Sequence, residues 1–334
     1  MIYEMLCQNS VTGIVYDITT LCSGISYHTT LGGQPGKLTF SVLEDPNNIL
    51  EMVCGSIISF IVDGTGIFFG YIFEMDTNES GLYKITAYDQ MYYLKNEEIY
   101  ITSNETASDI FIRVCRDVFP STTQEGQVIN VLNYEVVTPS SFIVPAYNHE
   151  DKTLYEIIEH GINQTNVYEN MQNYYFIKDK FGTLQFTSLT NELTNLVIGD
   201  GSLLTGYQYK ISIDKNTYNT IKIYRVNEKK GKWESWIQQD PSTQRQWGKL
   251  QMVEKVDSDL NEAEIRELAN NYFKLYNRES KTMKLTALGY KEIVAGSGFL
   301  FSLEKLNINQ YMWVTSATHN FEENYHTMTL DVFI

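Results

Sequence analysis

The chain has 334 residues and a formal net charge of −16. This length exceeds what one hydrophobic core usually organises, so we expect several packed modules. The acidic charge argues against specific nucleic-acid binding, because affinity for phosphates comes from Lys and Arg. We find neither a run of about 20 apolar residues nor a secretion signal, and we therefore expect no membrane insertion and assembly in the cytoplasm.

Aromatic composition and period-two patterns favour β structure in the first 90 residues. The 24 Tyr and 16 Phe suit half-buried pleated surfaces. Asp63-Gly64 separates two apolar runs and supplies the positive φ angles of a tight hairpin turn. We reject an aspartic-protease loop at residues 63–66, since that loop places Thr directly after Asp. The predicted strands occupy residues 36–43, 56–62, 67–75 and 82–89.

Helical spacing follows at two places. The first predicted helix begins with Thr106 and Asp109 at capping-box spacing and ends at Pro120. The second begins with Thr153 and Glu156 at the same spacing. The further predicted elements are a hairpin over 173–189, a helix over 259–280, and strands over 207–214, 219–227, 282–290, 298–306, 311–321 and 325–334.

These elements predict a mainly β fold (β+α) in which two small β-barrel-like domains flank helical and α+β modules. The pattern changes from strands to helices and back to strands along the chain. We predict an N-terminal β-barrel domain over 1–90, a helical segment and connector over 91–150, an α+β module over 151–205, and a C-terminal β-barrel domain with one inserted helix over 206–334.

The sequence carries no pattern that indicates catalysis, a cofactor or a metal site. Nucleophile and phosphate-binding signatures are missing from it. His319 and His326 lack an evident third metal ligand. A carboxylate dyad stays open, because 41 acidic residues offer many accidental pairs. Widely spaced cysteines without a CxxC pair predict reduced, mostly buried thiols; they are Cys7, Cys22, Cys54 and Cys115.

Residues 228–249 form a locally basic stretch, which includes Lys229 and Lys230, in an otherwise acidic chain. Trp and Arg side chains commonly anchor protein interfaces, so this stretch is a candidate contact surface for a partner protein. Two alternatives stay open: a platform for bases or sugars, and a solvated hairpin whose Trp side chains pack on a sheet. The candidate interface residues are Trp233, Trp236, Trp247 and Arg245.

Residues 72–119 resemble the XkdQ-like baseplate hub family of contractile-tailed phages, PBSX-like prophages and R-type, diffocin-like tailocins. The resemblance lies in the run TAYDQMYYLKN at residues 86–96 and the helix that follows it. Further similarity lies in the order of three later segments: KTLYEIIEHGINQT, the hairpin YYFIKDKFGTLQF, and the AEIRELANNYF helix. The shared order covers nearly the whole chain.

This resemblance implies a non-enzymatic structural subunit. In the family, a homotrimer with two barrel domains per chain forms a ring of six modules. The ring joins a sixfold tail tube, or its tube-initiator protein, to a threefold central spike, with LysM-type and other baseplate proteins as further partners. The expected location is the tail baseplate of a virion or tailocin particle. The alternative is a tail-associated carbohydrate-binding or cell-wall-degrading protein.

Overall fold

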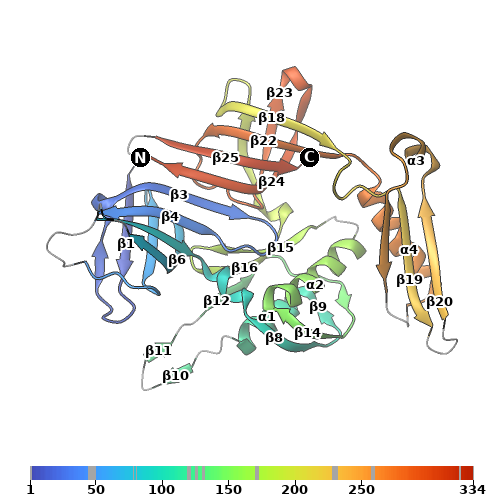
Figure 1. The fold of residues 1–334 in the computed structure, drawn as a ribbon, viewed down its shortest axis with the longest axis horizontal. Coiled ribbons are helices and arrows are strands. Elements are labelled where there is room, and N and C mark those ends of the chain that lie inside the picture. The colour runs from blue at the N-terminus through green and yellow to red at the C-terminus, as the bar shows by residue number, and fades with distance from the viewer. Residues whose placement is uncertain are drawn as a thin grey trace. The chain divides into compact units, whose positions relative to one another are not determined.

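A computed structural model describes residues 2–43, 50–77, 79, 81–118, 122–124, 127–129, 132–169, 173–227, 232–256, 260–322 and 325–333. Its contacts divide the chain into two compact units. Unit 1 comprises Met1–Thr165, Asn173–Gln208 and Met283–Ile334, and unit 2 comprises Asn166–Gln172 and Tyr209–Thr282. The predicted mainly β class is confirmed (Figure 1).

The largest sheet has 13 strands and runs in the order β18-β22-β25-β24-β3-β4-β7-β6-β5-β1-β2, with β23 pairing β24 and β17 pairing β23. The bounds are β1 (Tyr3–Gln8), β2 (Val15–Asp17), β3 (Cys22–Thr30), β4 (Lys37–Leu43), β5 (Ile57–Val62), β6 (Thr65–Thr77), β7 (Leu82–Tyr88), β17 (Leu193–Gly199), β18 (Leu204–Ser212), β22 (Ser280–Leu288), β23 (Gly298–Leu303), β24 (Ile308–Phe321) and β25 (His326–Phe333).

Strands β3 and β24 join the two terminal β regions, and they lie side by side in Figure 1. These regions, predicted as two domains over 1–90 and 206–334, pair in antiparallel fashion and form one continuous ladder. Among the described residues the ladder does not return to its first strand, so no closed barrel forms. Alternation identifies strands without identifying their partners, and the sequence pattern therefore could not reveal this junction.

The N-terminal part of this sheet follows the predicted alternation. Leu38, Phe40 and Val42 of β4 are buried, and the residues between them are partly exposed. Asp63 and Gly64 connect β5 to β6 with φ angles of 46° and 75°, which confirms the predicted hairpin turn. The buried side chains form one core with inward-facing residues of β1, β3 and β5.

The middle of unit 1 packs α1 (Ala107–Val118) and α2 (Leu154–Tyr168) against a small sheet. Both predicted caps are present: the Asp109 amide donates to Thr106 Oγ1 at 3.2 Å, and the Glu156 amide donates to Thr153 Oγ1 at 3.2 Å. Pro120, the predicted end of the first helix, lies outside the described residues. The hairpin β15 (Tyr175–Lys180) and β16 (Thr183–Ser188) is also as predicted.

The region over 91–150, predicted as a helical segment and connector, also contains several short strands. Strand β12 pairs in parallel with β16, and the other short strands form three antiparallel pairs, β10 with β11, β9 with β13 and β8 with β14. The strands are β8 (Glu97–Thr102), β9 (Glu105–Thr106), β10 (Thr122–Gln124), β11 (Gln127–Ile129), β12 (Asn133–Val136), β13 (Ile143–Val144) and β14 (Tyr147–Thr153). Short 3-10 helices are η1 (Thr19–Leu21), η2 (Gln90–Lys95), η3 (Leu189–Glu192) and η4 (Glu304–Leu306).

Unit 2 has its own core. Ile221 and Ile223 pack on Ile265 and Leu268 of the long helix, where the sequence analysis expects one helix. A second, short helix is also present, because Asp240 caps it and Pro241 fits its first turn. The elements are β19 (Thr220–Asn227), β20 (Lys232–Gln239), α3 (Pro241–Trp247), β21 (Gln251–Lys255) and α4 (Glu262–Tyr276).

The tip of the β15–β16 hairpin packs tightly on β6. Phe181 covers Gly66, where an added Cβ would lie 2.5 Å from the ring, and Phe69 covers Gly182, where it would lie 2.6 Å from the ring. The two rings contact each other at 5.8 Å between centroids. Glycine at both positions therefore permits the aromatic rings to interlock.

Replacing Gly66 by Ala should lower the free energy of unfolding by about 1–3 kcal/mol, because the new methyl group overlaps the Phe181 ring. Thermal or urea unfolding followed by circular dichroism measures this change. The neighbouring, exposed Thr65→Ala is the matched control and should remain close to wild type. Equal effects of the two substitutions would contradict the interlocked packing.

Candidate functional site

The three-stranded sheet of unit 2 buries one face and exposes the other. Ile221 and Ile223 point into the core, so the intervening positions of β19 and their neighbours on β20 and β21 point away from α4. We call these residues the open face: Lys222, Tyr224, Val226, Trp233, Ser235, Ile237, Val253 and Lys255.

Apolar side chains dominate the open face. Trp233 is 78% exposed, Ile237 57% and Val253 50%, and the Trp233 ring lies 5.9 Å from that of Tyr224. At the described outward positions of these strands, the charged residues are Lys222 and Lys255. An exposed aromatic and aliphatic patch with basic residues, in a chain of net charge −16, is a typical protein-contact surface.

The structure separates the four predicted interface residues. Only Trp233 lies on the open face. Trp236 is half-buried on the opposite face, where the Arg225 guanidinium lies 5.4 Å from its ring centre. Trp247 is half-buried at the end of α3, and Arg245 on the same helix is exposed.

The sequence order hides this arrangement, because a shift of one residue in a strand moves a side chain to the other face. Trp233 and Trp236 differ by three positions on β20 and therefore point in opposite directions. Lys229 and Lys230, which contributed to the predicted basic stretch, lie outside the described residues. The sequence-based prediction did not include the exposed Ile237 and Val253. Their alternation with inward-facing residues along each strand could have identified them.

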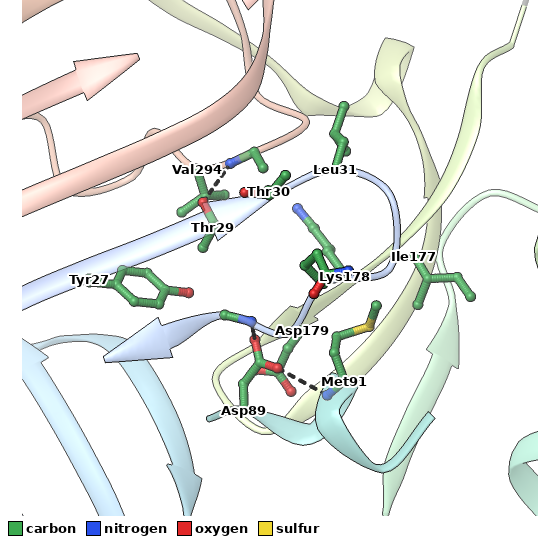
Figure 2. A pocket seen from close by; sticks show the side chains of 13 residues that line it. Tyr27, Thr29, Thr30, Leu31, Asp89, Met91, Ile177, Lys178, Asp179 and Val294 are labelled. Carbon is green, nitrogen blue, oxygen red and sulfur yellow. Dashed lines mark hydrogen bonds between the residues drawn. The ribbon is translucent and has the colours of Figure 1, made fainter. Parts of the chain in front are cut away.

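Unit 1 contains a second notable site, a small cavity of about 30 Å³ at the base of the β3–β4 connection (Figure 2). Asp89, the cap of η2, accepts a hydrogen bond from the Met91 amide at 3.0 Å and one from the Gly36 amide at 2.7 Å. Asp179 Oδ1 accepts a hydrogen bond from the Gly182 amide at 2.9 Å. Figure 2 shows the two carboxyl groups beside each other.

The environment of this carboxyl pair disfavours negative charge. Burial raises the pKa of Asp179 to about 7. Burial, and then the charge of Asp179, raises the pKa of Asp89 well above its ordinary value. Asp179 Oδ2 is buried without a hydrogen-bond partner. The two residues stand 90 positions apart, and each has an ordinary local role as a cap or a turn residue, so the sequence offered no signal for the pair.

His319 and His326, considered above as metal ligands, are hydrogen-bonded to each other. His319 Nε2 donates to the Ile293 carbonyl at 2.6 Å, so Nδ1 of the neutral ring accepts from His326 Nε2 at 2.8 Å. Burial lowers the pKa of both imidazoles to about 4. Within the described part of the chain, no group of three or more His, Cys, Asp or Glu side chains is placed to hold a metal ion.

Trp233→Ala should leave the stability of the chain within about 0.5 kcal/mol of wild type, because an exposed side chain loses little on truncation. Trp236→Ala should lower the free energy of unfolding by about 1–3 kcal/mol, since it removes a half-buried ring from the core of unit 2. Urea unfolding followed by circular dichroism compares the two variants. A larger loss for Trp233→Ala would contradict the assignment of the two faces.

Comparison with known proteins places this architecture among phage-related proteins. The chain is 29% identical over 289 residues to the uncharacterized protein YqbQ of Bacillus subtilis, and 28% identical over 280 residues to the phage-like element PBSX protein XkdQ of the same organism. Each match covers 83% of this chain and 81% of the relative.

Among solved structures, the 43 kDa tail protein of prophage MuSo2 from Shewanella oneidensis superposes with a TM-score of 0.69 at 12% identity, covering 98% of both chains. The described residues include no helix long and apolar enough to cross a membrane. The YQBQ-like family model matches residues 25–333, and the chain therefore belongs to the YQBQ-like family.

Proposed function

We propose that this chain is a structural, non-enzymatic subunit of a contractile phage tail or tailocin, and that it forms the hub of the baseplate. In this role three copies form a ring that joins a sixfold tail tube to a threefold central spike. The continuous ladder through β3 and β24 is the observation that carries the proposal. This ladder joins two β regions within each chain, so a trimer would contain six such regions.

The comparisons support the coarser part of this proposal, a structural role in a phage tail. The XkdQ relative belongs to a phage-like element, and the MuSo2 protein, which has the same fold over 98% of both chains, is a tail protein. The hub position, the trimer and the neighbouring proteins are our inference. The location that follows is the tail baseplate of the particle, after assembly in the bacterial cytoplasm.

For the contacts with other tail components we propose the unit 2 surface. Trp233 on the open face is its best anchor, because an exposed Trp beside a second aromatic ring provides a large contact area at little cost in side-chain entropy. Arg245 on α3 supplies an exposed cation of the same unit. Trp236 and Trp247 are half-buried and offer a partner less surface.

The same aromatic pair keeps one alternative open, a tail-associated carbohydrate-binding or cell-wall-degrading protein. Tyr224 and Trp233 lie close enough for their rings to contact one sugar ring together. A sugar site also needs several directional polar groups, and besides Tyr224 the polar side chains of the open face are Lys222, Ser235 and Lys255. We therefore favour the protein interface.

Light scattering of the purified full chain should give three times the monomer mass of 38.5 kDa, alone or once tube and spike proteins from the same tail are added. The trimer should co-purify with those two proteins. A monomer in the presence of both, or release of soluble fragments from peptidoglycan, would overturn the hub proposal in favour of the alternative.

The double substitution Trp233→Ala and Ile237→Ser should weaken recovery of the chain in assembled tails at least tenfold without changing its own mass. The reason is that contact anchors commonly contribute more than 1 kcal/mol each, and about 1.4 kcal/mol is tenfold in affinity. Val11→Ser, at an exposed apolar position of unit 1, is the control. Normal incorporation of the double variant would exclude the open face as a contact surface.

A further inference from the structure

We propose that Asp89 and Asp179 share one proton at neutral pH and act as a pH-sensitive latch between η2 and the tip of the β15–β16 hairpin. Both residues belong to unit 1, and the inference is independent of the hub proposal. The latch connects the N-terminal β region, which ends in η2, to the α+β module, which contributes the hairpin.

The hydrogen bonds of the two carboxyl groups indicate where the proton lies. Asp89 uses both oxygens as acceptors, for the amides of Met91 and Gly36. Asp179 uses Oδ1 as an acceptor, while its buried Oδ2 has no partner. An ionised carboxylate accepts hydrogen bonds only, whereas a protonated acid also donates one. A proton on Asp179 Oδ2, shared with the adjacent Asp89, therefore satisfies a buried atom that has no hydrogen-bond partner among the described residues.

Charge leads to the same conclusion. Two adjacent carboxylates in a buried site repel each other, so one of them retains a proton well above its usual pKa. Lys178 on β15 is the basic residue that lines the cavity, and it forms an ion pair with Glu192 of η3. Tyr27 of β3 is the remaining titratable group at the cavity, and burial raises its pKa well above the ordinary value, so it is neutral.

A bound divalent cation is the competing way to neutralise the pair, and ligand count argues against it. Calcium requires about six to eight oxygen ligands, several of them usually carboxylates. The described residues provide two carboxylates here and no larger cluster of metal-ligating side chains. A proton needs no additional ligand.

The latch has a defined direction with pH. An unfolded Asp ionises near pH 4, whereas Asp179 of the folded pair retains a proton up to about pH 7. The stabilising effect of the proton is complete below pH 4 and is lost as the pH rises towards 7. Above that range Asp179 is charged in a buried site, and Asp89, whose pKa that charge raises, holds the remaining proton of the pair. The buried charge lies on the hairpin whose Phe181 ring interlocks with Phe69.

The test compares the melting temperature of the full-length wild type with that of Asp179→Asn between pH 4 and pH 9. The Asn amide donates a hydrogen bond as the protonated acid does, at every pH. We expect a difference near zero at pH 4 that grows in favour of the variant to about 5 °C near pH 7 and is then constant. The difference between the two melting temperatures removes the effect of His149, His319 and His326, because these histidines titrate in both proteins. The exposed Asp214→Asn is the control and should show no such trend.

Two further measurements make the outcome decisive. Infrared spectra of the wild type at pH 7 should contain a protonated carboxylic-acid band that is missing in the double variant Asp89→Asn and Asp179→Asn. A difference in melting temperature that does not change with pH, or no acid band in the wild type, overturns the proposal. Calcium or magnesium that raises the melting temperature of the wild type but not of Asp179→Asn also overturns it, because the pair is then a cation site.

Discussion

The pairing of β24 with β3 is the contact on which the architecture of unit 1 depends. It brings together segments almost 300 residues apart in the sequence, and side chains reinforce the ladder at its centre. His28 Nδ1 lies 2.9 Å from Thr318 Oγ1, and Ser26 Oγ donates to Asn320 Oδ1 at 2.9 Å. Closing so long a loop is entropically unfavourable, and the six-residue register together with these bonds offsets that loss. Further contacts between the two terminal β regions add to this pairing, such as the hydrogen bond from Lys291 Nζ to the Val62 carbonyl at 2.9 Å.

Features governed by neighbours within four residues were predictable from the sequence. The caps at Thr106 and Thr153 form as expected because each hydroxyl reaches an amide three positions ahead. The turn at Asp63 forms because Asp-Gly tolerates positive φ. The burial of alternate β4 residues also followed from spacing alone. In each case the information required lies within one element.

Features that depend on distant partners were not predictable. The open face was predicted only through Trp233, because nothing in the sequence says which side of β20 meets α4. The carboxyl pair depends on the hairpin tip meeting η2, a contact between segments about 90 residues apart. Helix α3 is a different case: Asp240 before Pro241 is a recognisable start signal, and the polar composition of the surrounding stretch obscured it.

Because unit 2 has its own core, unit 1 and unit 2 can have different roles. Ile221 and Ile223 stabilise the small sheet from within unit 2, so residues on its open face contribute little to folding and are free to specify a contact. In unit 1 the opposite holds, since Gly66 and Asp179 lie where segments distant in sequence interlock. Substitutions in unit 1 therefore act on the integrity of the ladder and its attached module. Under the proposed function, substitutions on the open face act on what the chain binds, and this division suits a subunit that keeps one architecture while it contacts several neighbours.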